Sequence, residues 1–209
     1  TNKSGTGGIF IVNNSNTGGS TTQIDGNLDT STASTEDIQV IHNGVSTAKV
    51  VVAGNVTTHQ GGDILVWSDG GIDLSGVFMG SDDVSITALG QSAVIRGPIT
   101  ADVDGPGNGF IAYAAPFAQT KLHPTAVLTA PNVLLGFADN PTGLIQSLLG
   151  GWIGTNSISG VNATGGAYAK AADKPAVQIL TNNLTAVLFG SLNAPIAGNS
   201  DWLQNQLQI

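Results

Sequence analysis

The chain has 209 residues, of which 10% are charged, and six basic against fourteen acidic residues give it a formal net charge of −8. It contains no cysteine, which excludes disulfide frameworks and thiolate chemistry. The shortage of basic residues argues against binding nucleic acid, because such a face needs Lys and Arg opposite the phosphates. No uninterrupted apolar run is long enough for a membrane-spanning helix, so no membrane span is expected.

The first apolar segment lies close to the N-terminus. Four large apolar residues follow one another there: Ile9, Phe10, Ile11 and Val12. A strand that is apolar at every position is expected to be buried on both faces. We predict that it pairs with a sheet edge, with a neighbouring subunit favoured over the chain itself. Residues 13–35 are rich in Ser, Thr, Asn and Gly, so the segment 1–36 is expected to be a cap or a link between subunits.

From residue 37 to residue 199, apolar and polar residues alternate on a period of two, and Gly, Asn and Asp recur every few residues. Alternation is typical of β-strands, and the interrupting residues are typical of tight turns. Ile64 and Val84 open two similar units that close at Gly76 and Gly97. This pattern predicts an all-β fold, a right-handed parallel β-helix (solenoid) in which stacked turns of roughly 20 residues bury a shared core. A β-sandwich or jelly roll is the alternative, because both also contain short, evenly spaced strands.

The same repeat predicts which side chains point inward. The expected core residues are Ile64, Val66, Ile72, Leu74, Val84, Ile86 and Ile95, and the expected outward residues are Asp73, Ser85 and Arg96. Two further units run from Val127 to Gly136 and from Val177 to Gly190. Their first apolar residues are aligned with Ile64, as the first strand of a turn.

Helical signals are confined to the C-terminal part. Residues 142–152 have the spacing of a short amphipathic helix, and Ser200 and Asp201 are typical N-cap residues for a final turn or two. We therefore expect a single domain over 1–209, with turns over 37–199 and a C-terminal cap over 200–209. The candidate interface residues are Ile9, Phe10, Ile11, Val12, Trp202, Leu203 and Leu207.

Residues 61–76, GGDILVWSDGGIDLSG, resemble a segment that recurs in large bacterial exoproteins of the filamentous haemagglutinin type, which are exported by two-partner secretion. Residues 80–101 are similar to the repeats of that family. Residues 7–28 are similar to the opening of its secretion domain, although the Asn-Pro-Asn-Gly-Ile type of motif expected there is absent. The resemblance covers little more than the first half of the chain. It implies a secreted solenoid or one at the bacterial cell surface.

Carboxylates are the main candidates for chemistry. The acids that fall in predicted turns are Asp63, Asp69, Asp73, Asp82, Asp83, Asp102 and Asp104. Each lies beside or near Gly or Ser, where Asp usually caps its own backbone. If adjacent turns stack in register, the pair at 82 and 83 lies near the pair at 102 and 104. Beyond weak Ca²⁺ binding at these turns, no cofactor is expected, and His42, His59 and His123 lack the spacing of a metal site.

These observations favour a non-catalytic extracellular structural or adhesive protein. It is expected to self-assemble as a homo-oligomer or fibre, in a surface filament or matrix, or to mediate attachment to a host surface or glycan. The alternative is a carbohydrate-binding or carbohydrate-cleaving module on the same scaffold. That module requires acids aligned with a basic residue, or a groove lined by aromatic residues.

Overall fold

The computed structural model describes residues 2–3, 7–90, 92–105, 107–115, 119–122, 126–138 and 178–189. These residues form three parallel β-sheets and no helix. Sheet B contains, in spatial order, β2 (Ile9–Ser15), β5 (Ile38–Gly44), β8 (Ile64–Ser68), β11 (Val84–Ala88), β14 (Phe110–Ala115), β17 (Asn132–Ala138) and β19 (Asn183–Phe189).

The other two sheets are built from shorter strands. Sheet C contains β3 (Thr21–Ile24), β6 (Lys49–Val52), β9 (Gly71–Leu74), β12 (Ser92–Ile95) and β15 (Gln119–Leu122). Sheet A contains β1 (Asn2–Lys3), β4 (Leu28–Asp29), β7 (Val56–Thr57), β10 (Phe78–Met79), β13 (Ile99–Thr100), β16 (Val127–Thr129) and β18 (Gln178–Leu180).

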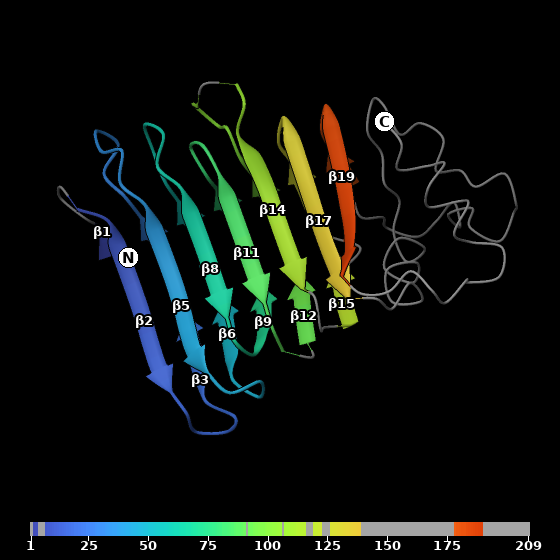
Figure 1. The fold of residues 1–209 in the computed structure, drawn as a ribbon. Coiled ribbons are helices and arrows are strands. Elements are labelled where there is room, and N and C mark those ends of the chain that lie inside the picture. The colour runs from blue at the N-terminus through green and yellow to red at the C-terminus, as the bar shows by residue number, and fades with distance from the viewer. Residues whose placement is uncertain are drawn as a thin grey trace, which may run out of the picture.

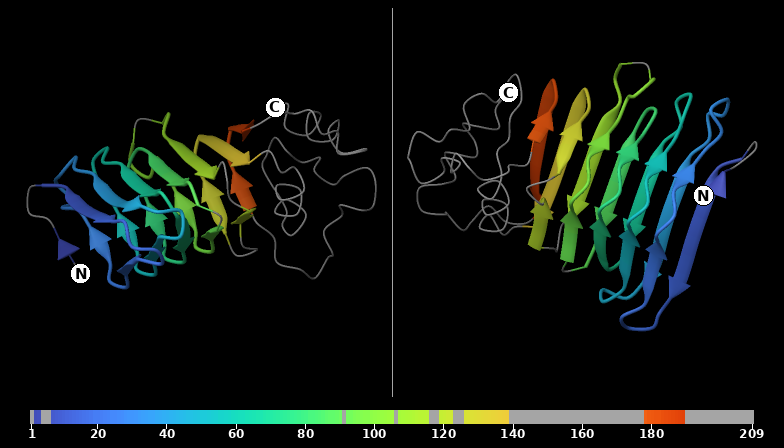
Figure 2. Two further views of the ribbon diagram at one scale, coloured as in Figure 1. Left: turned by 60° about the horizontal axis from the view of Figure 1, so that its bottom comes forward. Right: turned by 180° about the vertical axis from the view of Figure 1, so that it is seen from behind.

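The chain visits the sheets in the order B, C, A and then begins the next turn. In Figure 1 the strands of sheet B run downward in front, those of sheet C run upward behind, and successive turns advance from left to right. This winding is right-handed, and Figure 2 shows the same stack from behind. The fold is therefore the predicted right-handed parallel β-helix and not a sandwich.

The register confirms the repeat between the third and fourth turns. Ile64 pairs with Val84, and Ile72 pairs with Ala93. Other turns are longer, as the pairing of Ile9 with Ile38 and of Val84 with Ile111 shows. The difference lies mainly in the corner between sheet A and sheet B, which spans 80–83 in one turn and 101–109 in the next.

Alternate residues of every sheet fill one continuous core. All seven predicted core residues are at most 1% exposed: Ile64, Val66, Ile72, Leu74, Val84, Ile86 and Ile95. Asp73 and Ser85 are half-buried on the outer faces, and Arg96 is exposed. Both halves of that prediction are confirmed. Among the described residues, Phe78 and Tyr113 are the bulkiest that are fully buried, and they fill the interior beside the branched side chains.

Stacked glycines make the corner between sheets C and A. Gly26, Gly54, Gly76 and Gly97 occupy this corner in four successive turns. A Cβ atom added to any of the last three would collide with the carbonyl oxygen of the glycine one turn earlier. Only glycine permits the backbones to approach this closely. Gly76 and Gly97, at which the two predicted repeat units close, therefore lie at equivalent corners of successive turns.

The N-terminal strand differs from the expectation in two ways. All seven residues of β2 pair with β5 of the same chain, so the strand's partner is intramolecular. Its side chains alternate, and Phe10 and Val12 are 61% and 53% exposed, so it is not buried on both faces. The reason is that β2 belongs to a complete turn, β2–β3–β4, which falls inside the segment 1–36 that was expected to be a cap or link.

The alignment of the later repeats was also wrong by one strand. Val127 and Ile179 lie in sheet A, paired to β13 or β16, and Leu184 lies in sheet B opposite Val133. Alternation has the same period in all three sheets, so the pattern alone does not assign a strand to a sheet. The predicted helical segments 142–152 and 200–208 lie outside the described residues, as do Trp202, Leu203 and Leu207.

Candidate functional site

A column of acids runs along the edge of sheet B at the start of its strands. Asp37, Asp63 and Asp83 each immediately precede the first residue of β5, β8 or β11. The carboxylate of Asp37 accepts the N–H of Asp63 at 2.9 Å, and the carboxylate of Asp63 accepts the N–H of Asp83 at 3.0 Å. Asp83 in turn accepts the N–H of Phe110 at 2.9 Å. Each acid therefore caps the backbone of the next turn, and not its own as expected from sequence.

The same column continues with amides. Asn132 pairs with Phe110 in the register of sheet B, and Asn183 pairs with Asn132. The side-chain N–H of Asn183 donates to the Oδ1 of Asn132 at 2.9 Å. Acid and amide side chains thus share one structural role, which is to hold successive turns together where the strands of sheet B begin.

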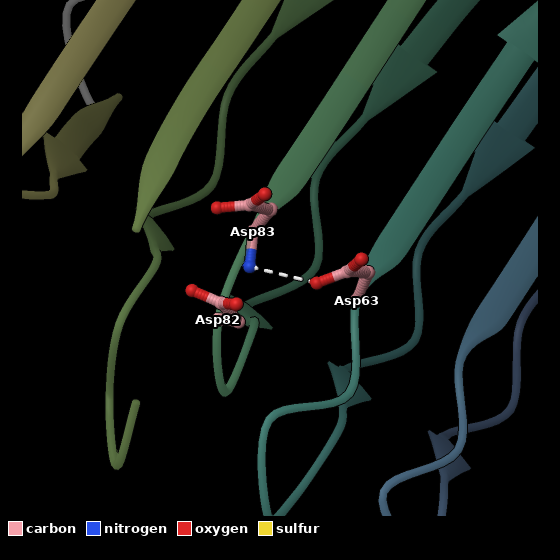
Figure 3. A group of neighbouring side chains, drawn as sticks. All are labelled: Asp63, Asp82 and Asp83. Carbon is pink, nitrogen blue, oxygen red and sulfur yellow. Dashed lines mark hydrogen bonds between the residues drawn. The ribbon is translucent and has the colours of Figure 1, made fainter. Parts of the chain in front are cut away.

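Three carboxylates of this region approach one another. One oxygen each of Asp63, Asp82 and Asp83 lies within 4.8 Å of the others. Figure 3 shows these side chains on adjacent turns, with the hydrogen bond from the Asp83 N–H to Asp63. All three are half-buried. This acidic cluster joins Asp63 to Asp82 and Asp83, a contact that was not predicted, although the repeat that aligns Ile64 with Val84 carried the signal for it.

The environment of the acidic cluster disfavours ionisation. Burial raises the pKa of Asp63 above its ordinary value of 3.8, and the neighbouring charges of Asp37 and Asp82 add to the rise. Burial likewise raises the pKa of Asp83, with further contributions from Asp82, Asp63 and Asp102. The backbone N–H groups that these two carboxylates accept act in the opposite direction and hold the side chains in place.

The predicted proximity of the second pair of acids is confirmed for Asp102. Its N–H donates to the carbonyl oxygen of Asp82 at 2.8 Å, and its charge acts on Asp83. Its own carboxylate accepts the N–H of Gly107 at 3.0 Å and so closes its turn. Asp104 accepts a hydrogen bond from the hydroxyl of Ser81. These contacts organise the longer corner between sheets A and B.

The acidic cluster provides oxygen ligands of the type that hard cations prefer. Ca²⁺ takes six to eight oxygens, and two of the three carboxylates already accept backbone N–H groups. Weak Ca²⁺ binding at these turns stays a prediction. The cations Lys49 and Arg96 pair instead with Asp73 on the outer face of sheet C, at 3.4 and 3.0 Å.

His42 is buried and bonds two hydroxyls of the preceding turn, a role that was not predicted from sequence. His42 is fully buried, and its two ring nitrogens lie 3.0 Å from the hydroxyls of Ser20 and Thr22 in the preceding turn. Thr22 also accepts from the amide of Asn13. His59 lies elsewhere, 3.1 Å from Asp29, and His123 lies outside the described residues. The alternation of Ile38, Val40 and His42 in one strand carried the signal that His42 points inward.

At the N-terminal end of the solenoid, β1 covers the edge of β4 in sheet A, whereas the first strands of sheets B and C are open among the described residues. Of these, β2 has β5 as its partner and β3 has β6, so the other edge of each strand faces outward along the solenoid axis. A depression of about 300 Å³ lies in this first turn, with Ile11, Thr22, Ile24 and Leu28 among its lining residues. Ile9 and Ile11 are half-buried and pack against the core. The predicted interface residues Ile9–Val12 are therefore found at this open end.

Comparisons with protein-family models, curated proteins and solved structures gave no match to this chain. In the part of the chain that the structure describes, we find no helix with the length and apolar character needed to cross a membrane.

Proposed function

We propose that this chain is a non-catalytic structural or adhesive protein, secreted or held at a bacterial cell surface, that self-assembles through the N-terminal end of its solenoid. The observation that carries the proposal is the first turn, where the free edge of β2 lies beside a depression lined by apolar residues and by polar ones such as Asp25 and Asn27. The resemblance of residues 61–76 to filamentous haemagglutinin-type exoproteins supports an extracellular setting.

Within the part of the chain that the structure describes, the outer edge of β2 has no strand partner and offers its backbone groups. The N–H of Ile9 donates to the carbonyl of Asp37, so Ile9 points its backbone groups toward β5. Backbone groups alternate in direction along a parallel strand, so those of Phe10 and Val12 face the open edge. An unprotected edge of this kind is a template for adding another strand. No charged side chain of β2 opposes this addition.

Apolar contacts add affinity to the strand pairing. Ile11, Ile24 and Leu28 line the depression beside the free edge, and an approaching turn with apolar inward residues would cover them. Full burial of one such side chain is worth roughly 1.5–3 kcal/mol. A second copy of the chain provides turns of this composition, which favours end-to-end self-assembly.

The test removes one donor from the open edge. Val12→Pro deletes an N–H that points away from β5, and proline is tolerated on an edge strand in that orientation. Val12→Thr is the matched control, since it keeps the N–H and the β-branched shape. We expect sedimentation velocity to show larger species for the parent and for Val12→Thr, and their loss in Val12→Pro with the melting temperature retained. A parent that stays monomeric across the concentration series, or a Val12→Pro variant that assembles like the parent, contradicts the proposal.

The carbohydrate-binding alternative stays a prediction without a specific observation in its favour. Phe10 and Trp67 both lie on the outer face of sheet B, but in different columns, because Ile41 pairs with Val12 on one side and with Trp67 on the other. Aromatic residues aligned turn after turn, which a glycan-binding groove needs, are not found among the described strands.

A further inference from the structure

The outer face of sheet B is uncharged. At its centre, three neighbouring strands present Leu65 and Trp67 from β8, Ser85 and Thr87 from β11, and Ala112 and Ala114 from β14. Toward the N-terminal end, Phe10 and Val12 on β2 are more than half exposed. The outer faces of the other two sheets carry charges, such as Asp29 in sheet A and Lys49 and Asp73 in sheet C. A chain of net charge −8 thus keeps one flat face free of charge.

Polar groups border this face on both sides. The acids Asp37, Asp63 and Asp83 line the edge where the strands begin. At the opposite edge the amide of Asn43 donates to Asn14 at 2.9 Å, and Asp69 accepts the indole N–H of Trp67 at 3.0 Å. A centre without charges inside a polar rim is compatible with the usual anatomy of a protein–protein interface, whose core is depleted of charged residues. The bond to Asp69 also holds the Trp67 ring in one orientation, which lowers the entropy cost of docking.

The sizes of the central side chains make the face self-complementary. Trp67, Thr87 and Ala114 are register neighbours on three successive strands, so a large residue and a small one flank Thr87. A two-fold axis that runs parallel to β11, in the plane between two facing sheets, reverses the solenoid axis and brings Trp67 of one copy opposite Ala114 of the other. The same axis brings Leu65 opposite Ala112. In a two-fold dimer every contact occurs twice, once in each direction, so the large residue of each copy must face the small residue of the other.

The available area is sufficient for a reversible dimer. Strands lie about 4.8 Å apart and rise about 3.3 Å per residue, so seven strands with a five-residue core present roughly 500 Å² per copy. Two copies then bury on the order of 1,000 Å², which is the size of a weak, transient interface and close to the minimum for a biological contact.

We propose that two copies of this chain pair face to face through the outer face of sheet B, with their solenoid axes antiparallel and Thr87 near the two-fold axis. The proposal rests on the proposed self-assembly and adds to it a lateral contact that is distinct from the end of the solenoid. Sheets that pack in this way lie about 10 Å apart. The uncharged centre means that no ion must be desolvated for the pair to form.

Single cysteines test the pairing directly, because the chain has none of its own. In the full chain, Thr87→Cys is expected to give a covalent dimer as the main product with a short bismaleimide cross-linker. Met79→Cys, on the outer face of sheet A and 37% exposed, is the matched control and is expected to stay monomeric under the same treatment.

A mixture of two variants tests the antiparallel arrangement. Trp67→Cys mixed with Ala114→Cys is expected to give several-fold more covalent dimer than either variant alone. A yield that does not rise on mixing overturns the arrangement. If Thr87→Cys gives no cross-linked dimer, the face-to-face contact is overturned. The contact is also overturned if the chain binds a neutral polysaccharide through this face as a monomer.

The outcome separates lateral pairing from end-to-end assembly. Thr87 lies on the fourth strand of sheet B, about 14 Å from the N-terminal end by strand spacing, so copies joined at their ends do not bring two Thr87 residues together. Larger species in sedimentation without the Thr87→Cys dimer contradict this inference and leave the end contact intact. The same cross-linking is repeated with Thr87→Cys in the Val12→Pro background. If the covalent dimer forms and every larger species is also retained, only the end contact is contradicted.

Discussion

At the scale of single residues, Asp and Asn side chains stand at equivalent positions of successive turns, where the strands of sheet B begin, and bond each turn to the next. Asp37, Asp63 and Asp83 each accept an N–H from the following turn. These bonds satisfy backbone groups that the irregular corners would otherwise leave without partners. The cost is that carboxylates of the same sign lie close together in partly buried surroundings.

The raised pKa values of Asp63 and Asp83 predict a specific pH dependence. Because the folded-state pKa exceeds the unfolded value, the native state binds protons first as the pH falls. The destabilisation present at neutral pH is therefore relieved as the pH drops through the raised pKa, and the relief is complete below the ordinary value of 3.8. We expect Asp63→Asn/Asp83→Asn to be at least as stable as the parent at pH 7, with its advantage shrinking toward pH 4.

Urea denaturation at several pH values measures this difference, and Asp25→Asn is the control because Asp25 is exposed. Asparagine keeps the carbonyl oxygen that accepts the N–H of the next turn, and Asn132 already occupies the same column. A difference between variant and parent that is constant with pH contradicts the expectation.

Burial inside the solenoid predicts a large cost for a charge in the core. Ile86 is fully buried between Val66 and Tyr113, its register partners in the adjacent turns. Ile86→Asp is expected to lower the free energy of unfolding by several kcal/mol, because a buried carboxylate without a partner is costly. Ser85→Asp, on the outer face of the same strand, is expected to change it far less. Thermal denaturation followed by circular dichroism decides, and an unchanged melting temperature for Ile86→Asp would falsify the inward assignment.

At the scale of the elements, the corners determine how the strands stack. Asn27 and Asn55 flank the glycine corner, and each accepts through its side chain an N–H of the next turn, at 2.9 and 3.1 Å. Glycine stacking and asparagine bonding together set the spacing between sheets C and A. The corner between sheets A and B is also bonded from turn to turn, through Asp37, Asp63 and Asp83. It nevertheless varies in length, from 80–83 in one turn to 101–109 in the next, and this makes the repeat period irregular.

The glycine corner predicts position-dependent effects of a single methyl group. Gly76→Ala would place its Cβ against the carbonyl oxygen of Gly54, and the required shift of two turns is expected to cost about 1–3 kcal/mol, as overpacking does elsewhere. Gly7→Ala meets no atom within 4 Å and is the matched control. Equal stabilities of the two variants in urea denaturation would show that the corner relaxes freely.

At the scale of the whole molecule, three faces of different character surround one apolar core. Sheets A and C carry charges on their outer faces, and Lys49, Asp73 and Arg96 form a small ion-pair group on sheet C. Sheet B carries none at its centre. Each turn contacts mainly its neighbours, so stability depends on stacking and the end turns are the weakest points. The open first turn and the uncharged face are for this reason the two surfaces at which copies are expected to meet.

The sequence alone determined the fold class and the inward side of most strands. Period-two alternation tied to Gly76 and Gly97 specifies register, since a slip of one residue would expose every core side chain to water. The same pattern predicted that Asp82 and Asp102 lie close. It did not assign Val127 or Ile179 to a sheet, because all three sheets share one period.

Only the tertiary structure decided which residues meet between turns. Corner lengths range widely, so the pairing of Val84 with Ile111 depends on a turn length that the 20-residue repeat does not give. The structure also placed Ile9–Val12 in a turn of the chain's own solenoid, where half of its apolar residues point outward. The physical reason is that a strand in a solenoid obtains its burial from the turns stacked on it. Those neighbours are a full turn away in the sequence, as β5 is from β2, and the length of that turn differs from one to the next.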